Sequence, residues 1–250
     1  MRPVITLLTD FGTADGYVGE MKGVLLARVP DATLVDITHE IPPQDVEAAR
    51  LTVARVWRRF PPGTVHLVVV DPDVGTDRLA LAVNSDDRWL VGPDNGVLSP
   101  ALLASGASAV VLDVPPGASA SFHGRDVFAP AAAALALGSG LASLGSAVTH
   151  PVIRRTPEPH RIEEGVLAGV VIVIDRFGNA VTNLVGMRAG AIEAAGKTLP
   201  LRRTYGDVAP GKPLAIVGSS GLIEIAVRDG SAARLLSLTR GSPVVFRATS

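Results

Sequence analysis

The stretch Val65-His66-Leu67-Val68-Val69-Val70, followed by Asp71-Pro72-Asp73-Val74-Gly75-Thr76-Asp77-Arg78, decides how the first half of the chain folds. Its apolar run is typical of a buried strand that delivers Asp71 at its carboxyl end. Proline and glycine then predict a turn, with the next strand over residues 79–83. A hairpin of this kind would bring Arg78 back beside Asp71. A buried acid that faces a guanidinium marks either a salt bridge that closes a loop or an active site.

Strands and helices alternate on both sides of this stretch. The apolar residues 4–9 predict a strand covered on both faces, and helical spacing predicts a helix over about 15–29. The remaining expected elements are a strand at 33–37, a helix capped by Asp45, strands at 89–91 and 109–112, a short helix near 97–105 and an Ala-rich helix within 127–149. This alternation predicts a mainly parallel α/β sheet domain over residues 1–150.

The pattern changes after residue 150. Residues 151–164 are rich in proline and charge and predict a linker. Apolar segments separated by Gly and Asn turns follow, at 166–174, 181–184, 214–217, 222–227 and 244–246. They predict a smaller all-β domain over residues 165–250, either a sandwich or a barrel.

Composition excludes several classes of protein. The 250 residues carry a formal net charge of −1 and only 4% aromatic residues, which gives no electrostatic or stacking signature for nucleic acid or an anionic membrane. The long uncharged stretch at 127–149 is interrupted by proline and glycine, so it is not expected to span a membrane. The absence of cysteine excludes disulfides, thiolate metal sites and a cysteine nucleophile, and it permits a reducing cytoplasm.

Polar side chains follow the predicted strands of the first domain. Asp10, His39 and Asp71 come at or just after the ends of three strands, and Asp94-Asn95 follows a fourth. In open α/β sheets ligands bind outside the carboxyl ends of the strands, so these positions are site candidates. Asp and Asn are also ordinary turn residues, which explains Asp94, Asn95 and His39 equally well, whereas Asp10 and Asp71 favour function.

Three further segments carry polar groups at turns. His123 lies in a Gly-flanked turn before a helix, where a histidine commonly hydrogen-bonds the helix entry. In the second domain, residues 175–179 form a tight turn, and the small residues at 218–221 could hold a carboxylate through backbone amides. Turn chemistry alone also accounts for both. No dinucleotide, Walker, zincin or serine-hydrolase motif occurs.

Taken together, the motifs are similar to those of the S-adenosyl-L-methionine (SAM) hydrolases that form adenosine, also called SAM hydroxide adenosyltransferases, which are relatives of the fluorinases and chlorinases. The matching segments run in order along nearly the whole chain: Leu8-Thr9-Asp10-Phe11-Gly12, Asp36-Ile37-Thr38-His39, Asp71-Pro72 with Val74-Gly75-Thr76, Gly92-Pro93-Asp94-Asn95-Gly96, Phe122-His123-Gly124-Arg125-Asp126, Asp175-Arg176-Phe177-Gly178-Asn179 and Ser219-Ser220-Gly221.

The resemblance implies an N-terminal α/β domain, a C-terminal barrel-like β domain and a homotrimer with the SAM site between subunits. It implies that SAM is the substrate, with no further cofactor and no metal, in a cytoplasmic enzyme. Catalytic roles around an attacking water fall on Asp71, Arg78 and His123, and the ribose contact falls on Asp10. Contacts to adenine and methionine fall on Asp175, Asn179 and Ser219, with Ser220 as the neighbouring alternative.

The chemistry of the residues agrees with this. Methionine leaves SAM as a neutral thioether, so the site needs only to place and activate a water in line with the ribose C5′. Asp71 can orient that water or take its proton, Arg78 can stabilise developing hydroxide, and His123 can orient or relay.

Four positions depart from relatives. The fluorinases carry Tyr where this chain has Asp71 and Ser where it has Gly124, and both differences disfavour halide chemistry. Asp73 replaces the glycine usual in the hydrolases and adds a second acid near Asp71. Gln44 aligns with a fluorinase tryptophan, so that wall of the pocket is expected to differ.

Three alternatives remain open on the sequence alone. A SAM-dependent halogenase would give 5′-chloroadenosine in the presence of chloride. A metal-dependent hydrolase using Asp71, Asp73 and Asp10 would lose turnover with EDTA and regain it with a divalent ion. A non-catalytic SAM or adenosine sensor would bind SAM and leave it intact.

Overall fold

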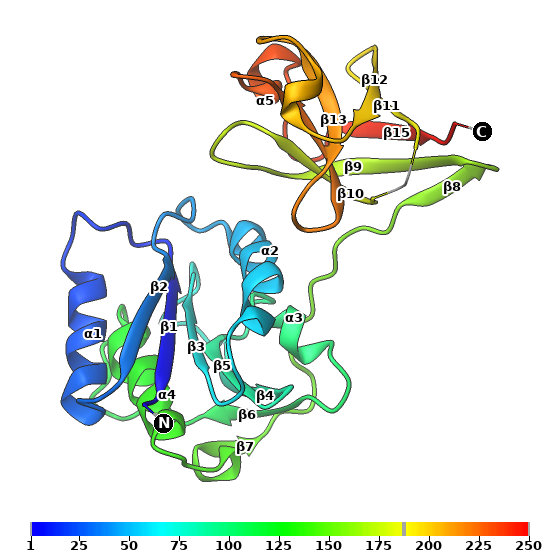
Figure 1. Ribbon diagram of the computed structural model, residues 1–250. Coiled ribbons are helices and arrows are strands. Elements are labelled where there is room, and N and C mark those ends of the chain that lie inside the picture. The colour runs from blue at the N-terminus through cyan, green and yellow to red at the C-terminus, as the bar shows by residue number, and fades with distance from the viewer. Residues whose placement is uncertain (1, 187–188, 250) are drawn as a thin grey trace. The chain divides into compact units, whose positions relative to one another are not determined.

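The computed structural model describes residues 2–186 and 189–249. The chain forms two compact units, residues 1–154 and residues 155–250. Figure 1 shows helices packed on a sheet in the first unit and mostly strands in the second. The predicted fold class, an α/β domain followed by a smaller β-barrel domain, is therefore confirmed.

The first unit is built on a mixed sheet of seven strands. Its order is β2 (Thr33–Thr38), β1 (Val4–Thr9), β3 (Val65–Val69), β5 (Arg88–Pro93), β4 (Ala80–Ser85), β6 (Ser108–Leu112) and β7 (Gly145–Ala147). The strands β2, β1, β3 and β5 run parallel, with Leu7 of β1 opposite Leu67 of β3. β4 pairs antiparallel with both β5 and β6, and β7 pairs antiparallel with β6.

The expected hairpin between β3 and β4 is wrong. Two consecutive residues, Asp86 and Asp87, have positive φ of 47° and 56° and close a tight two-residue turn that pairs β4 with β5 instead. The other edge of β5 pairs with β3, so β5 lies between the two strands that the sequence had suggested as neighbours. Arg78 nevertheless returns to Asp71, because β4 begins at the edge of the sheet where β3 ends.

Helices cover both faces of this sheet, as Figure 1 shows. Alternation of side chains along the strands divides the core in two. On one face Leu7 and Val69 pack with α1 (Tyr17–Arg28) and α4 (Ala129–Ala136). On the other, Leu8 and Val68 pack with α2 (Val46–Val56) and α3 (Ser99–Leu102). Most residues of the central strands are buried, which is why those strands read as continuous apolar runs.

Helix boundaries follow local chemistry. Asp45 caps α2 as predicted, with Oδ1 accepting from the backbone N–H of Ala48 at 2.9 Å. The helix expected near 97–105 is only the single turn α3. Ahead of α4, a π-helical turn, η2 (Gly124–Phe128), follows directly after His123. Short 3₁₀ turns lie at η1 (Trp57–Arg59), η3 (Leu141–Ser143) and η4 (Tyr205–Asp207).

The second unit is a closed barrel. Around it run β9 (Val166–Ile174), β10 (Ala180–Val185), β14 (Leu222–Val227), β13 (Pro213–Val217), β12 (Lys197–Arg202), β11 (Ala191–Ala194) and β15 (Pro243–Arg247). Pairing of β9 with both β10 and β15 closes the ring. The strand β8 (His160–Glu163) pairs antiparallel with the first residues of β9 and is not part of the ring. The short helix α5 (Ala232–Leu235) packs on the barrel core, of which Val171, Ile225 and Phe246 are buried members.

Four strands were not expected: β7, β8, β11 and β12. β8 is exposed and polar, and it lies within the predicted linker at 151–164, so the last part of that segment is a strand. β12 contains Pro200, a residue that strands rarely hold, and its hairpin with β11 turns at Ala195-Gly196, both with positive φ. The predicted domain boundaries themselves stay a prediction.

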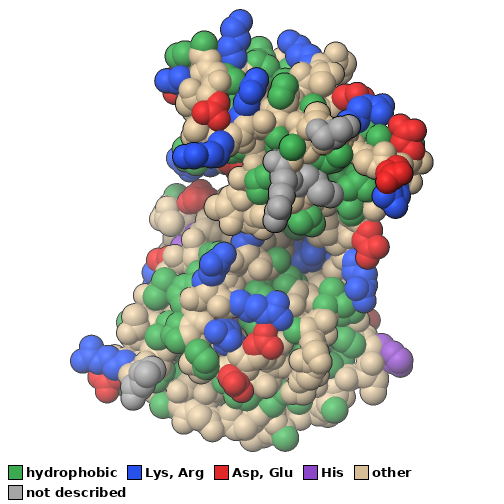
Figure 2. Space-filling model, turned by 45° about the vertical axis from the view of Figure 1, so that its right-hand side comes forward, with side chains coloured by type: hydrophobic (Ala, Val, Ile, Leu, Met, Phe, Trp, Pro, Cys, Tyr) green, Lys and Arg blue, Asp and Glu red, His purple; other side chains and the backbone are tan. Residues whose placement is uncertain are grey.

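The surface mixes charges of both signs. Figure 2 shows basic and acidic side chains interspersed over the face in view. No helix within the described ranges, 2–186 and 189–249, is long and apolar enough to cross a membrane.

Candidate active site

A buried ion pair joins the two ends of the 71–78 loop. Arg78 donates from Nε to Asp71 Oδ1 at 2.8 Å and from Nη2 to Asp71 Oδ2. Both side chains are almost wholly withdrawn from solvent, with 7% of Arg78 and 5% of Asp71 exposed. Such a two-point contact fixes the planes of both groups relative to each other. The sequence leaves a salt bridge and an active site as alternatives. The geometry of the pair is that of a salt bridge, and this does not exclude a role in an active site.

His123 completes this group. Its Nδ1 lies 2.9 Å from Arg78 Nη2, and the residue is 7% exposed. A guanidinium can only donate, so Nδ1 accepts and the ring proton of the neutral imidazole lies on Nε2. The ring of Phe128 supports both partners, since it lies edge-on to His123 and under the Arg78 guanidinium at 5.2 Å.

The surroundings of His123 favour its neutral form. Burial lowers the pKa of His123, and the positive charge of Arg78 lowers it further, while Asp71 and Asp126 partly oppose both. A neutral imidazole with Nδ1 occupied has one polar function left, the Nε2–H donor. The group therefore offers a carboxylate, a cation and a fixed N–H donor in one place.

The turn that carries His123 is braced by its neighbours. Arg125 donates to both carboxylate oxygens of Asp126 at 2.7 and 2.9 Å and to Glu20 of α1 at 2.8 Å. Hydrogen bonding from Arg125 lowers the pKa of Asp126 to about 2, so this carboxylate stays ionised. Asp126 Oδ2 also accepts from the N–H of Ser119, which ties the segment before His123 to the same clamp.

Asp10, the predicted ribose contact, lies half-buried just after β1. Its Oδ2 accepts from the backbone N–H of Gln44 at 2.7 Å, and Gln44 has a positive φ of 66°. His39 lies beside this loop, with its carbonyl accepting from Gly12 N–H and its Nδ1 2.8 Å from Thr9 Oγ1. His39 is 4% exposed, and these contacts give it a structural role. Asp10 thus presents a half-buried carboxylate just after the carboxyl end of β1.

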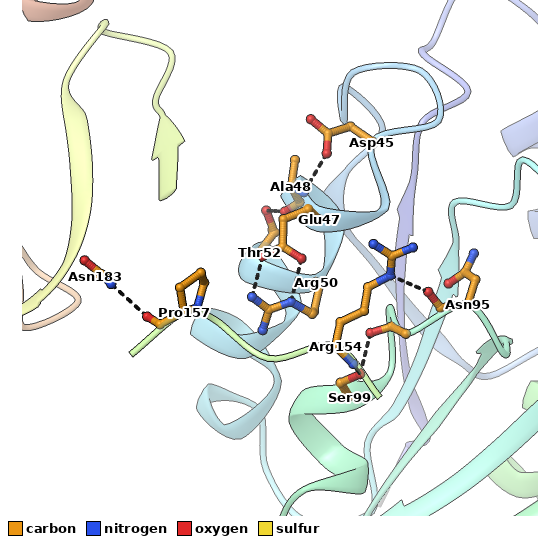
Figure 3. Close-up of polar contacts among 11 residues, drawn as sticks. Asp45, Glu47, Ala48, Arg50, Thr52, Asn95, Ser99, Arg154, Pro157 and Asn183 are labelled. Carbon is orange, nitrogen blue, oxygen red and sulfur yellow. Dashed lines mark hydrogen bonds and ion pairs between the residues drawn. The ribbon is translucent and has the colours of Figure 1, made fainter. Parts of the chain in front are cut away.

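Asp94 and Asn95 lie in the turn after β5, next to both ends of the 71–78 loop. Asn95 Nδ2 donates to Val70 O at 2.8 Å, and Asp94 N–H donates to Leu79 O at 2.8 Å. Burial raises the pKa of Asp94, and the positive charge of Arg78 opposes that shift. Behind the turn, Arg154 reaches Asn95, as Figure 3 shows.

The predicted site residues of the second unit lie at two of its turns. Asp175 Oδ1 accepts from the backbone N–H groups of Phe177 and Asn179, both at 2.9 Å, and its Oδ2 accepts from Asn179 Nδ2 at 2.9 Å. The hydroxyl of Tyr205 lies 3.4 Å from Asn179 Nδ2. Ser219 and Ser220 lie in the turn between β13 and β14, where Gly221 N–H donates to Gly218 O.

Acidic residues do not gather into a metal-type cluster in the part of the chain that the structure describes. Asp73 is exposed and uses its carbonyl, which accepts from Thr76, to shape the turn. Asp71 directs both of its oxygens at Arg78.

The chain is a two-unit protein, an α/β domain followed by a β-barrel, and its buried Asp–Arg–His group lies at the carboxyl edge of the sheet, where open α/β folds bind their ligands. Family models make the assignment specific. The SAM hydroxide adenosyltransferase N-terminal domain matches residues 5–145, and the C-terminal domain of the same family matches residues 169–245. The chain belongs to the SAM hydroxide adenosyltransferase family.

Individual relatives agree. The chain is 45% identical to the (R)-S-adenosyl-L-methionine hydrolase of Thermus thermophilus, over 98% of this chain and 99% of that one. The crystal structure of an uncharacterised conserved protein from Thermotoga maritima superposes with a TM-score of 0.88 at 34% identity, covering 97% of this chain and 99% of that one. A fluorinase from Actinopolyspora mzabensis is more distant, at 28% identity over 97% and 96% of the two chains.

Sequence reasoning missed one residue beside the site. The sequence pattern places Arg154 in the linker, yet its side chain and backbone contact Asn95 and Ser99. Its partners are 59 and 55 positions away in the sequence, so no local pattern marks it.

Proposed function

We propose that this chain is an (R)-S-adenosyl-L-methionine hydrolase that cleaves SAM to adenosine and L-methionine. The observation that carries the proposal is the hydrogen-bonded group of Asp71, Arg78 and His123, buried at the carboxyl edge of the sheet. The full-length similarity to a relative named for this activity supports it.

The reaction is a displacement at carbon. A water oxygen forms a bond to the ribose C5′ while the C5′–S bond breaks. The electron pair of the C5′–S bond passes to sulfur. The positive sulfonium becomes the neutral thioether of methionine, so the leaving group needs no general acid. What remains for the protein is to hold the water in line, about 3–3.5 Å from C5′, and to remove one proton.

The three side chains divide this work. Asp71 keeps lone pairs beyond the two that face Arg78, and one of them accepts the water's proton. Arg78 stabilises the negative charge that develops on the oxygen. His123, neutral and with its Nδ1 occupied, presents Nε2–H as a donor that orients the water oxygen.

The remaining predicted residues are proposed to bind substrate. Asp10 accepts hydrogen bonds from the ribose hydroxyls, and Asp175, Asn179, Ser219 and Ser220 contact adenine and methionine. We further propose a cytoplasmic homotrimer in which one subunit's first domain and its neighbour's second domain share each site. Light scattering coupled to size-exclusion chromatography measures the mass directly, and a monomer would exclude the shared site.

Product analysis in ¹⁸O-labelled water tests the function. Purified protein is incubated with SAM, and the products are separated and weighed by mass spectrometry. We expect adenosine that carries one ¹⁸O atom, at the 5′ position, and unlabelled methionine, because the solvent oxygen attacks C5′. Heat-denatured protein gives the uncatalysed background. Intact SAM after hours of incubation would overturn the proposal.

The same assay distinguishes the other activities. Formation of 5′-chloroadenosine in added chloride would assign a halogenase. Loss of turnover with EDTA and recovery with a divalent ion would assign a metal-dependent hydrolase. Either result replaces the mechanism above.

A further inference from the structure

One turn holds both ends of the loop that carries Asp71 and Arg78. Val70 and Leu79 are the residues that flank these two side chains in the sequence. Asn95 Nδ2 donates to Val70 O and Asp94 N–H donates to Leu79 O, both at 2.8 Å. Leu79 O also accepts from Arg78 Nη1 at 3.3 Å, so the turn contacts the guanidinium through a single carbonyl.

The topology explains why this turn has that position. β5 lies between β3 and β4, so the residues that follow it emerge between the end of β3 and the beginning of β4. β3 ends at Val69, and Val70 is fully buried. A buried carbonyl without a partner costs free energy, and the Asn95 side chain supplies the partner where the strand no longer does.

Asn95 is itself held from both sides. Its Oδ1 accepts from Val97 N–H at 3.1 Å, and its own carbonyl accepts from Arg154 Nε at 2.8 Å. Arg154 crosses Gly96 so closely that a Cβ there would collide with Arg154 Cγ, and its backbone N–H donates to Ser99 Oγ. Figure 3 shows Arg154 contacting Asn95 and Ser99. Asn95 is 8% exposed, and both its Nδ2 donor and its Oδ1 acceptor have backbone partners, so its amide has one fixed orientation.

We propose that Asn95 is a positioning residue of the SAM hydrolysis reaction, and that Arg154 supports it. By fixing the Val70 carbonyl, Asn95 sets where the Asp71 carboxylate stands relative to Arg78, without touching substrate. Displacement of a reacting group by ~1 Å costs about 100-fold in rate, so loss of this bond acts on turnover. This inference rests on the proposed function.

The test compares Asn95→Ala, Asn95→Asp and Arg154→Met with the wild type. The Asn95→Ala variant is expected to lower kcat for SAM by about 10–100-fold, with KM and adenosine affinity within about threefold of wild type. The Arg154→Met variant lowers kcat in the same direction by a smaller factor. Asn84→Ala is the matched control, because Asn84 Nδ2 also bonds a backbone carbonyl, that of Arg88, at the opposite end of β4. It should retain wild-type turnover.

The Asn95→Asp variant adds a readout that a purely structural role would not move. An ionised carboxylate at this position cannot donate to Val70 O, whereas a protonated carboxyl group can. The ratio of variant to wild-type kcat is therefore expected to rise as the pH is lowered from neutral into the titration range of a carboxyl group, while the ratio for Asn95→Ala stays flat. If Asn95→Ala does not fold, this pH series decides.

Failure of this inference differs from failure of the proposed function. Wild-type protein that leaves SAM intact overturns both. Active wild type with Asn95 variants of unchanged kcat, or with changes confined to KM and adenosine affinity, overturns the positioning role alone.

Discussion

Arg78 donates hydrogen bonds to both carboxylate oxygens of Asp71, and this contact joins the first and last residues of the 71–78 loop. The loop is closed by its own reactive side chains, so its shape and its chemistry are coupled. Removing either partner leaves a buried charge without compensation, which is costly in free energy.

The first prediction concerns this pair. Asp71→Asn keeps the shape of the side chain and removes the negative charge that makes it a base for the water's proton, and we expect kcat for SAM to fall about 10²–10⁴-fold. Arg78→Lys keeps the charge but replaces a planar fork by a point donor, so it should also lose turnover. Both variants should still bind adenosine, measured by calorimetry. Asp71→Asn with turnover close to that of the wild type would place the water elsewhere.

The second prediction is the pH dependence of the rate. Because the pKa of His123 lies below its usual 6.5, the neutral ring that accepts from Arg78 persists to more acid pH. Protonation at Nδ1 would place two donors face to face. We therefore expect kcat to hold as pH falls to 6.5 and to decline only below it, and His123→Gln to lack that decline. A decline centred above pH 6.5 in the wild type would contradict the assignment.

The third prediction concerns stability. His66 of β3 is 2% exposed, and its Nδ1 lies 2.7 Å from Thr6 Oγ1 of β1. Burial lowers the pKa of His66 from 6.5 to about 4, so between these pH values the unfolded chain binds a proton that the folded chain does not. The contribution of His66 to stability is then complete above pH 6.5 and is lost as pH falls toward 4, by roughly 2–3 kcal/mol between about pH 7.5 and 4.5.

Urea titrations at the two pH values check this prediction. The wild type should lose more stability than His66→Asn, which has no proton to bind. His160→Asn serves as the control, because His160 is exposed and should leave the pH dependence as it is. If the wild type and His66→Asn lose the same free energy of unfolding between the two pH values, another group causes the loss.

The fourth prediction separates binding from chemistry. Asp10 is proposed to hold the ribose, so Asp10→Ala should raise the adenosine Kd and the KM for SAM about tenfold or more, with a smaller change in kcat. Because Asp10 also accepts from Gln44 N–H, the variant's melting temperature must be measured beside its Kd. Unchanged adenosine affinity in a folded variant would remove Asp10 from the site.

The sequence predicted what depends on local chemistry. The Asp45 cap, the buried strands β1 and β3 and the position of Asp71 at a strand end all follow from residues near one another. The roles of Arg78 and His123 came from the family resemblance, and the structure places the two side chains in contact.

What escaped prediction depends on distant pairing. β5 lies between β3 and β4 because its other edge pairs with β3, through residues such as Val65 and Trp89 that lie far apart in the sequence. The contact of Arg154 with Asn95 spans 59 positions, and the polar edge strand β8 has no apolar alternation to reveal it. Each of these is fixed by tertiary packing.

The last prediction tests whether the shape of the 71–78 loop matters for turnover. Gly75 has φ of +80°, and a Cβ there would collide with the backbone oxygen of Ala120. Gly106 has φ of +74° with nothing within 4 Å of the same position, so it is a matched control.

Alanine at either position costs about 1–2 kcal/mol because it must adopt a left-handed backbone. Only Gly75→Ala must also displace a backbone segment, and that segment is the one Asp126 holds at Ser119. We expect Gly75→Ala to lower both the melting temperature and kcat further than Gly106→Ala, whose kcat should match the wild type. Equal turnover in the two variants would mean that the loop tolerates the shift, and that Asp71 and Arg78 keep their geometry without support from the 119–121 segment.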